Sequence, residues 1–340
     1  MIKEDTMKVR KVRHLLIAGI LSLIINFVLI DATNCFSEAG KSPKLYHSEI
    51  VASLPPGSWL ENLIWDNEGN LYITDVIHKT IFKYSLASNS VSEFSKMEGH
   101  PFGLAIDDDG TIYVSALKIA PGKPGSMDSN VIFKIDKQGN SSLFLETPKA
   151  RGLNGLTYFN PGVFLVCDSW AGVIWKLDVK NSTMTEWAKH PLLATKIPAP
   201  GANGIKLYKN YAFVSNSSLA SIVRIAIDPD GNPSDTQVYK ENACRDDFCI
   251  SENGNIYATG RSKNVVYLVK ETGKPEIIAD DENDVKGNTA VVFGKNESDA
   301  EWIYVIGDGG LWEAGGDPSK MKSATLVKIY VGEKGYFTQK

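Results

Sequence analysis

The sequence predicts an all-β fold, a six-bladed β-propeller with four-stranded antiparallel blades. Two observations predict it. Beyond about residue 42 the chain has almost no helical periodicity, and short β-rich runs are separated by Gly, Asn and Asp turns. One module also recurs six times at intervals of roughly 40 to 50 residues, the repeat length of propeller blades. Each copy has an apolar strand, a polar turn and a second strand, often of the type apolar-Tyr-apolar.

The blades follow one another along the chain in a common register. Their first strands are predicted at residues 61–65, 102–106, 154–158, 203–205, 246–250 and 288–292. The second strands follow at residues 71–75, 112–114, 164–166, 212–214, 256–258 and 302–305, and each copy continues into a third β-rich run. The segment from Ser48 to Leu54 is the candidate for the strand that closes the ring. Two separate β-sandwiches are the alternative, but they would not produce six copies in one register.

Length, composition and charge limit the classes of function that the chain can have. The chain has 340 residues, of which 43% are hydrophobic and 22% charged, so it is long and apolar enough for a folded globular protein. The formal net charge is −4, and the lysines are scattered. No basic stripe of the kind that binds a phosphate backbone is present, which excludes nucleic acid as a partner and leaves a small-molecule substrate.

The N-terminal 39 residues are predicted to be a signal peptide or an N-terminal anchor, and residues 40–340 a single propeller domain. Basic residues at positions 8, 10, 11 and 13 precede an apolar run at 15–30, with small residues soon after it. This pattern predicts a secreted or periplasmic protein. The alternative is a protein held at the membrane by the uncleaved N-terminal segment. No other membrane partner is indicated.

Cys244 and Cys249 are close enough in sequence to form a disulfide in an oxidising compartment. Two buried, unpaired thiols are the alternative.

Polar residues occupy the start of most first strands. In a propeller these positions converge around the central channel at one mouth. They are Glu61, Phe102, Asn154, Asn203, Asp246 and Asn288. Five of the six carry side-chain oxygens, which suit a hard divalent cation, whereas hydrogen bonds to channel water and backbone are the structural alternative. The five histidines lie elsewhere, so a histidine-rich zinc site is not indicated.

Several motifs resemble, in order, those of the senescence-marker-protein, gluconolactonase and regucalcin-like family of six-bladed lactonases. They are Gly152–Gly155 with Val166–Ser169, Gly201–Ile205, Asp246–Ile250 with Gly254–Tyr257, and Asn288–Gly294. The resemblance covers about residues 54–331. There are departures from it, because Asn62 and Leu63 stand where the family has Gly-Pro after the glutamate, and the arginine that some members use to hold a sugar acid is not evident.

The resemblance implies roles for the aligned residues. Glu61, Asn203 and Asp246 would coordinate the metal, Asn154 would be a fourth ligand or a substrate contact, and Asp246 would also be the catalytic base. The metal would be calcium, with magnesium, manganese or zinc as alternatives. Phe102 and Asn288, in the same register, are predicted to contact substrate together with Asn154.

Nearby aspartates are predicted to have supporting roles. Asp247 would point away from the channel, because successive strand residues face opposite sides. Asp75 and Asp168, at the ends of second strands, are strand-end or turn residues or else lie behind the metal ligands.

The predicted function is therefore metal-dependent hydrolysis of a lactone or related ester at the channel mouth. A bound metal would polarise the carbonyl, and a carboxylate would activate water. One alternative is a non-enzymatic propeller with a structural metal, in which loops such as 119–130 or 190–200 bind a ligand or protein. The other is a strictosidine-synthase-like, metal-free enzyme, against which the oxygen-rich residue set argues.

Overall fold

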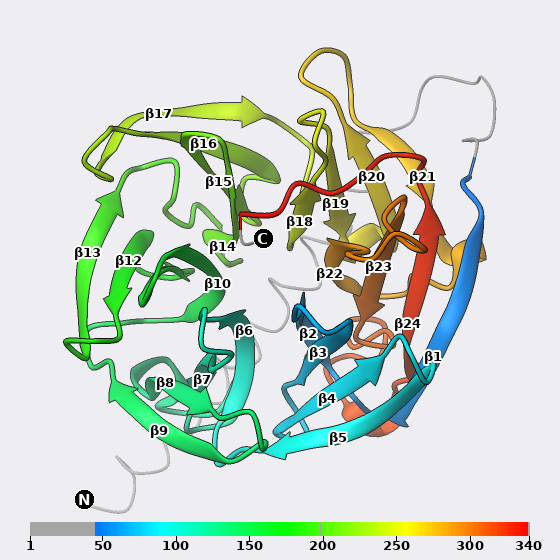
Figure 1. Ribbon diagram of the computed structural model, residues 1–340, viewed down its shortest axis with the longest axis horizontal. Coiled ribbons are helices and arrows are strands. Elements are labelled where there is room, and N and C mark those ends of the chain that lie inside the picture. Colours follow the sequence, from blue (N-terminus) through cyan, green and yellow to red (C-terminus); the bar gives the residue numbers. More distant parts are fainter. Residues whose placement is uncertain (1–44, 198, 339–340) are drawn as a thin grey trace, which may run out of the picture. The chain divides into compact units, whose positions relative to one another are not determined.

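A computed structural model describes residues 45–338 apart from residue 198, and these form one compact unit. The predicted signal or anchor segment, residues 1–39, lies outside the described residues. Six four-stranded antiparallel sheets surround a central axis (Figure 1). The six-bladed β-propeller predicted from the sequence is therefore confirmed. None of the described helices has the length and apolar character needed to cross a membrane.

Each blade has its first strand at the axis and its fourth at the rim (Figure 1). Blade one contains β2 (Leu60–Trp65), β3 (Asn70–Asp75), β4 (Thr80–Ser85) and β5 (Ser90–Lys96). Blade two contains β6 (His100–Ile106), β7 (Ile112–Leu117), β8 (Asn130–Ile135) and β9 (Ser141–Glu146). Blade three contains β10 (Leu153–Asn160), β11 (Val163–Asp168), β12 (Val173–Asp178) and β13 (Thr183–Lys189).

The second half of the ring repeats this order. Blade four contains β14 (Ala202–Tyr208), β15 (Tyr211–Asn216), β16 (Ser221–Ile227) and β17 (Pro233–Lys240). Blade five contains β18 (Phe248–Ile250), β19 (Ile256–Gly260), β20 (Val265–Val269) and β21 (Glu276–Ala279). Blade six contains β22 (Asn288–Phe293), β23 (Trp302–Gly307), β24 (Ser323–Tyr330) and β1 (Ser48–Pro56). Short 3₁₀ turns lie at Ser126–Asp128 (η1), Arg261–Lys263 (η2), Asp281–Asn283 (η3) and Pro318–Lys320 (η4).

The N-terminal strand closes the ring. β1 pairs antiparallel with β24, so the first described strand completes the last blade. This confirms the closing role predicted for residues 48–54. Pairing also covers the edge of β24, which would otherwise leave backbone N–H and C=O groups open to other chains.

The hydrophobic core is divided among the blade interfaces. Six clusters of buried side chains each join two consecutive blades, from blades one and two round to blades six and one. In the cluster between blades six and one, for example, Trp65 packs edge-on against Tyr304 with ring centroids 5.1 Å apart. Alternate residues of the strands point to opposite faces, so each blade contributes side chains to two interfaces.

Buried hydroxyl groups join each blade to the next near the axis. At every junction one Ser or Thr donates a hydrogen bond to a backbone oxygen in, or just before, the first strand of the following blade. The pairs are Thr74 with Phe102, Ser115 with Asn154, Ser169 with Ala202, Ser215 with Asp246, Thr259 with Thr289, and Thr289 with Leu60. We call these six hydroxyls the hydroxyl belt. Because they bond to the backbone of the first strands, they fix where the channel-lining residues lie.

Glycines let neighbouring first strands approach closely beside this belt. A Cβ on Gly103 would lie 2.2 Å from the backbone oxygen of Asn154, and one on Gly155 would lie 2.4 Å from that of Asn203. A side chain at either position would push two blades apart. The asparagines that precede or face these glycines therefore stand at the closest approach of the blades.

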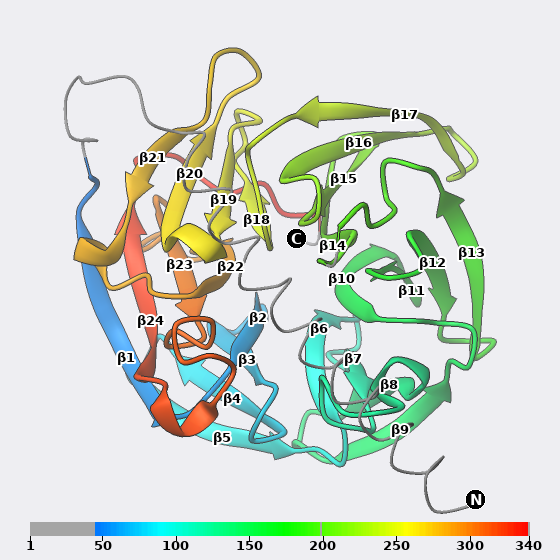
Figure 2. The ribbon, with the colours of Figure 1, turned by 180° about the vertical axis from the view of Figure 1, so that it is seen from behind.

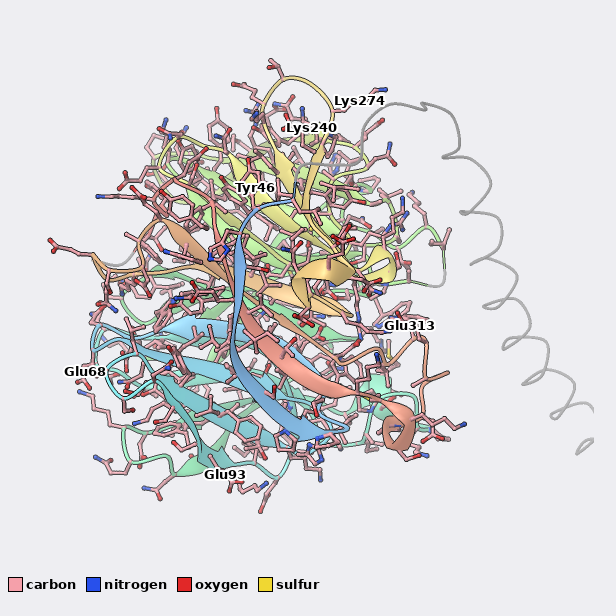
Figure 3. The ribbon with its side chains drawn as sticks, turned by 90° about the vertical axis from the view of Figure 1, so that its right-hand side faces the viewer. Tyr46, Glu68, Glu93, Lys240, Lys274 and Glu313 are labelled. Atoms are coloured by element: carbon pink, nitrogen blue, oxygen red, sulfur yellow. The ribbon has the colours of Figure 1, made fainter. Side chains whose placement is uncertain are left out.

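The two faces of the ring carry different loops. First strands begin, and second strands end, at the face that Figure 2 shows, with the β23–β24 loop in front. We call this the site face. Figure 3 shows the ring from the side, with Glu313 of the β23–β24 loop and Glu68 of the β2–β3 turn on opposite faces. The C-terminal segment crosses the face opposite the site face (Figure 1), where Tyr336 N–H donates to the backbone oxygen of Ile250 at 2.9 Å.

Candidate functional site

Four of the six predicted channel residues meet at the site face in hydrogen-bonded pairs. The Asn154 side-chain nitrogen lies 3.5 Å from Glu61 Oε1, although the two residues are far apart in the chain. The Asn203 side-chain nitrogen donates to Asp246 Oδ1 at 2.8 Å. All four side chains are at least 91% buried, with exposed fractions of 4%, 9%, 5% and 3% for Glu61, Asn154, Asn203 and Asp246. The sequence register thus brought together residues from blades one, three, four and five.

Blade two contributes an apolar side chain in the same register. The ring of Phe102 packs edge-on against Trp59, with centroids 5.9 Å apart, in a small cluster with Val76 and Leu117. Phe102 therefore packs against the same indole that bonds Glu61, and its substrate contact stays a prediction.

Blade six differs from the sequence alignment by one residue. Asn62, Gly103, Gly204 and Asp247 each donate a backbone N–H to a hydroxyl of the second strand, and the channel residue is the one before each. By the strand pairing, Ala290 has this place in blade six, so Thr289 and not Asn288 falls in the channel register. Asn288 is fully buried and its Nδ2 donates to the Val265 backbone oxygen at 2.8 Å. The sequence alone could not distinguish Thr289 from Asn288, because the choice depends on how β22 pairs with β23.

Arg261 completes the site, and sequence reasoning missed it. It stands just after β19, at the site-face end of the second strand of blade five. Its Nε and Nη2 donate to Asp308 Oδ2 at 2.9 and 2.6 Å, and its Nη1 lies 3.5 Å from Asp246 Oδ2. Its position in the sequence could have indicated Arg261, because the ends of second strands reach the same mouth of the channel as the starts of first strands.

Trp59 links the glutamate to the arginine. Its Nε1 donates to Glu61 Oε2 at 2.6 Å, while the Arg261 guanidinium lies over its ring, 5.1 Å from the centroid. A guanidinium over an indole face is held by the ring quadrupole as well as by its ion pairs. One indole therefore orients both the acidic and the basic group.

Burial shifts the ionisation of the cluster. Desolvation raises the pKa of Glu61 to about 7, although Arg261 and the Trp59 hydrogen bond oppose the shift. Desolvation, with the nearby Glu61, also raises the pKa of Asp246 well above its usual range. Burial disfavours the charge on Arg261, but Asp308, Asp246 and Glu61 together raise its pKa. The guanidinium is thus the fixed positive charge of the site.

The carboxyl oxygens of the site are engaged by protein donors in this arrangement. In the described residues no three His, Cys, Asp or Glu side chains are grouped so as to hold a metal ion. Both oxygens of Asp246 already face donors, Asn203 and Arg261, and Glu61 Oε2 faces Trp59. A metal would have to displace Arg261 from Asp246 and then sit beside its charge. The predicted metal set of Glu61, Asn154, Asn203 and Asp246 stays a prediction.

The remaining aspartates of the mouth have structural partners. Asp75 and Asp168 accept backbone N–H groups of the turns that follow them, as turn residues do. Asp247 is 3% exposed and accepts from Lys206 Nζ at 2.8 Å, so its carboxylate is paired beneath the channel residues. Cys244 and Cys249 are free, buried thiols, the second of the two alternatives for this pair.

Comparison with known proteins gives likenesses in sequence and in fold. No family model matches the chain. A protein from Phoma sp, named provisionally as a hetero-Diels-Alderase, is 23% identical over 332 residues, which cover 84% of this chain and 94% of the relative. The similarly named hetero-Diels-Alderase asR5 from Sarocladium schorii is 27% identical over 158 residues, covering 40% of this chain and 39% of the relative.

Solved structures share the architecture. The calcium-binding protein regucalcin from Agrobacterium tumefaciens matches with a TM-score of 0.65 at 14% identity, covering 88% of this chain and 98% of its own. A luciferin-regenerating enzyme matches with a TM-score of 0.64 at 16% identity, covering 86% and 97%. A gluconolactonase from Xanthomonas campestris gives 0.60 at 13% identity, covering 86% and 96%. These likenesses confirm the resemblance to gluconolactonase and regucalcin propellers at the level of the fold.

Proposed function

We propose that the protein is an enzyme that polarises a carbonyl group of a small molecule at the channel mouth, and that the reaction is a hetero-Diels–Alder cycloaddition. The observation that carries this proposal is the guanidinium of Arg261, whose side chain is 14% exposed and which is held by Asp308 beside Asp246 and over Trp59. The name of the Phoma sp relative, matched over 94% of its length, supports the reaction class.

The chemistry suits a site without a committed nucleophile. A hetero-Diels–Alder reaction joins a conjugated unit containing a heteroatom to an alkene. Three π bonds are replaced by two σ bonds and one π bond, and no atom leaves. A donor aimed at the carbonyl oxygen stabilises the charge that grows there, and a donor already held in place avoids reorganisation during the reaction. Holding both reacting parts in one cavity removes much of the entropic cost.

Arg261 Nη1 is the nitrogen of the guanidinium that we propose donates a hydrogen bond to the substrate. Nε and Nη2 are engaged with Asp308, whereas the Nη1 contact with Asp246 is long, at 3.5 Å. Glu61 supplies a second polar group, because Trp59 occupies its Oε2, while its Oε1 lies 3.5 Å from the Asn154 side-chain nitrogen. The Trp59 indole contacts both Glu61 and Arg261, which come from blades one and five.

The test uses the purified protein, with bound metal measured by elemental analysis before and after chelation. Enones and enals paired with vinyl ethers, or tethered to alkenes, are the substrates, and the stereoisomers formed are separated by chiral chromatography. We expect stereoselective cycloadduct formation that survives chelation. Arg261→Lys retains the charge but loses the planar fork, and we expect it to lower turnover by about 100-fold, the effect of losing one preorganised donor. Unchanged turnover in Arg261→Lys would remove this residue as the donor.

Metal-dependent hydrolysis of a lactone or related ester is the second candidate, favoured by the meeting of Glu61, Asn154, Asn203 and Asp246 at one mouth. The same preparations are tested on a lactone and ester panel. Hydrolysis that chelation abolishes and calcium restores, with Asp246→Asn reduced at least ~100-fold, would establish this candidate and overturn the cycloaddition. No turnover on either panel would favour a non-enzymatic binding propeller.

A further inference from the structure

Exposed apolar side chains gather on the loops of the site face. Four large ones are Ile119, Met127, Trp170 and Trp312, with exposed fractions of 40%, 36%, 39% and 59%. They lie on the β7–β8, β11–β12 and β23–β24 loops, which join second to third strands and so leave the ring at the channel mouth. Figure 2 looks onto this face. Trp170 and Trp312 are the two tryptophans among the exposed large hydrophobic residues of the described chain.

Trp170 stands beside the polar site. A Cβ on Gly152 would lie 2.3 Å from Trp170 Cδ1, so the indole covers the backbone two residues before Asn154. The absence of a side chain at Gly152 is what allows this position. Trp170 therefore packs at the start of the first strand of blade three, the strand that carries Asn154.

Polar contacts tie the other two loops to neighbouring blades. Asp128, next to Met127, forms an ion pair with Arg151, which leads into blade three. Glu313, next to Trp312, accepts a hydrogen bond from Asn264 Nδ2 at 3.0 Å and lies 3.8 Å from Lys286 Nζ. Asn264 follows the η2 turn that carries Arg261. The apolar side chains thus stand on loops that are tethered to neighbouring blades.

We infer that the channel mouth binds a flat, conjugated and largely apolar carbonyl compound, with its carbonyl oxygen toward Arg261 and its hydrocarbon body against Trp170 and Trp312. The inference rests on the proposed function for the role of Arg261. A ligand stacked on these indoles would bury the part of their apolar surface that is now exposed, which favours binding. A sugar lactone, covered with hydroxyl groups, would bury less apolar surface against these indoles than a hydrocarbon body of the same size.

The arrangement favours a small molecule over a protein. The four apolar side chains stand on three loops of the site face, two of which also carry charged residues. A stable protein interface needs about 800 Å² per partner with an apolar middle. Here the middle is the carboxylate and guanidinium cluster, which needs a ligand small enough to enter it.

Calorimetric titration with (E)-4-phenylbut-3-en-2-one, a flat aryl enone, tests the inference on the full chain. The comparison ligands are 4-phenylbutan-2-one, which lacks the conjugation, and D-glucono-1,5-lactone. We expect the enone to bind at least ~10-fold more tightly than the lactone and more tightly than the saturated ketone. Trp170→Ala and Trp312→Ala should each weaken enone binding about 5- to 10-fold, the scale of one aromatic stacking contact.

Leu143→Ala is the matched control, because Leu143 is 43% exposed but lies on β9 at the outer rim of blade two. It should leave enone binding unchanged. Equal affinity for the enone and the lactone, or no effect of either tryptophan variant, overturns the inference.

The two proposals fail separately. If the tryptophan variants weaken enone binding but Arg261→Lys leaves cycloaddition unchanged, the substrate class stands and the proposed donor falls. If Arg261→Lys loses turnover while both tryptophan variants bind the enone normally, the proposed function stands and this inference falls.

Discussion

At the scale of single residues, the character of the site depends on one cation. Glu61 and Asp246 are buried carboxyl groups that would repel one another if both were ionised, and the charge of Arg261 lies beside them. Within this cluster Arg261 is the cation that pairs with Asp246 and Asp308. Its acid–base behaviour is therefore set by burial as much as by pairing.

Replacing Glu61 with Gln should change how stability depends on pH. The folded pKa of Glu61 is raised to about 7 from an ordinary value near 4.5, so the folded state holds this proton more tightly than the unfolded state. The stability it contributes is fully present below the unfolded pKa and is lost as pH rises through about 7. The free energy of unfolding of the wild type should therefore fall, relative to that of Glu61→Gln, between about pH 5 and about pH 8.

Urea denaturation in the presence of chelator, at several pH values, measures this difference. The chelator removes divalent metal ions that could bind Glu61 and change its pKa. A difference between the two proteins that does not change with pH would show that Glu61 is ionised throughout and that its pKa is not raised.

At the scale of the structural element, the hydroxyl belt positions the channel residues. Ser215 accepts from the Gly204 N–H at 2.8 Å and donates to the Asp246 backbone oxygen at 2.5 Å, so one side chain joins blade four to blade five. Ser115 makes the corresponding bond from blade two to Asn154 at 2.6 Å. The belt acts where the first strands meet, whereas the apolar clusters hold the blades over their whole width.

Ser215→Ala should destabilise the protein by on the order of 2 kcal/mol or more, because it leaves a buried N–H and a buried C=O without their partner. Thermal or urea unfolding measures the loss. Ser234→Ala is the control, since Ser234 is exposed and its hydroxyl bonds the Ala226 backbone oxygen at the outer strand β17. It should cost less than about 0.5 kcal/mol. Similar losses in the two variants would mean that the belt contributes no more than an ordinary surface hydroxyl.

At the scale of the whole molecule, stability depends on closing the ring. β1 is the outer strand of blade six, and Leu54 on it is buried in the cluster that joins blades six and one. Without β1 the edge of β24 would be open and that cluster incomplete.

A chain that begins at residue 57 should therefore melt at least about 5 °C lower than one that begins at residue 45, or should aggregate. Calorimetry and size-exclusion chromatography compare the two. The chain from residue 45 retains β1 and is the control for removing the N-terminal segment. Equal melting temperatures would show that the other three strands of blade six suffice to close the ring.

The repeat in the sequence determined the fold and most of the site. Turn residues and apolar-Tyr-apolar strands at even spacing permit little other than a propeller, and the start of each first strand is tied to the channel by that topology. Glu61, Asn154, Asn203 and Asp246 could be aligned for this reason. The sequence alone also showed that these four residues are polar, at strand positions where a structural repeat usually has small or apolar residues.

Tertiary structure decided the rest. A bulge in strand pairing is not written in composition, so only the register of β22 against β23 could place Thr289, and not Asn288, at the channel. Arg261 carries no motif, and its meaning comes from Asp308, a blade away, which pins its guanidinium beside Asp246. The sequence gives each residue type, but charge balance at a buried site depends on which side chains from different blades meet there. That convergence adds the guanidinium of Arg261 to the predicted set of Glu61, Asn154, Asn203 and Asp246.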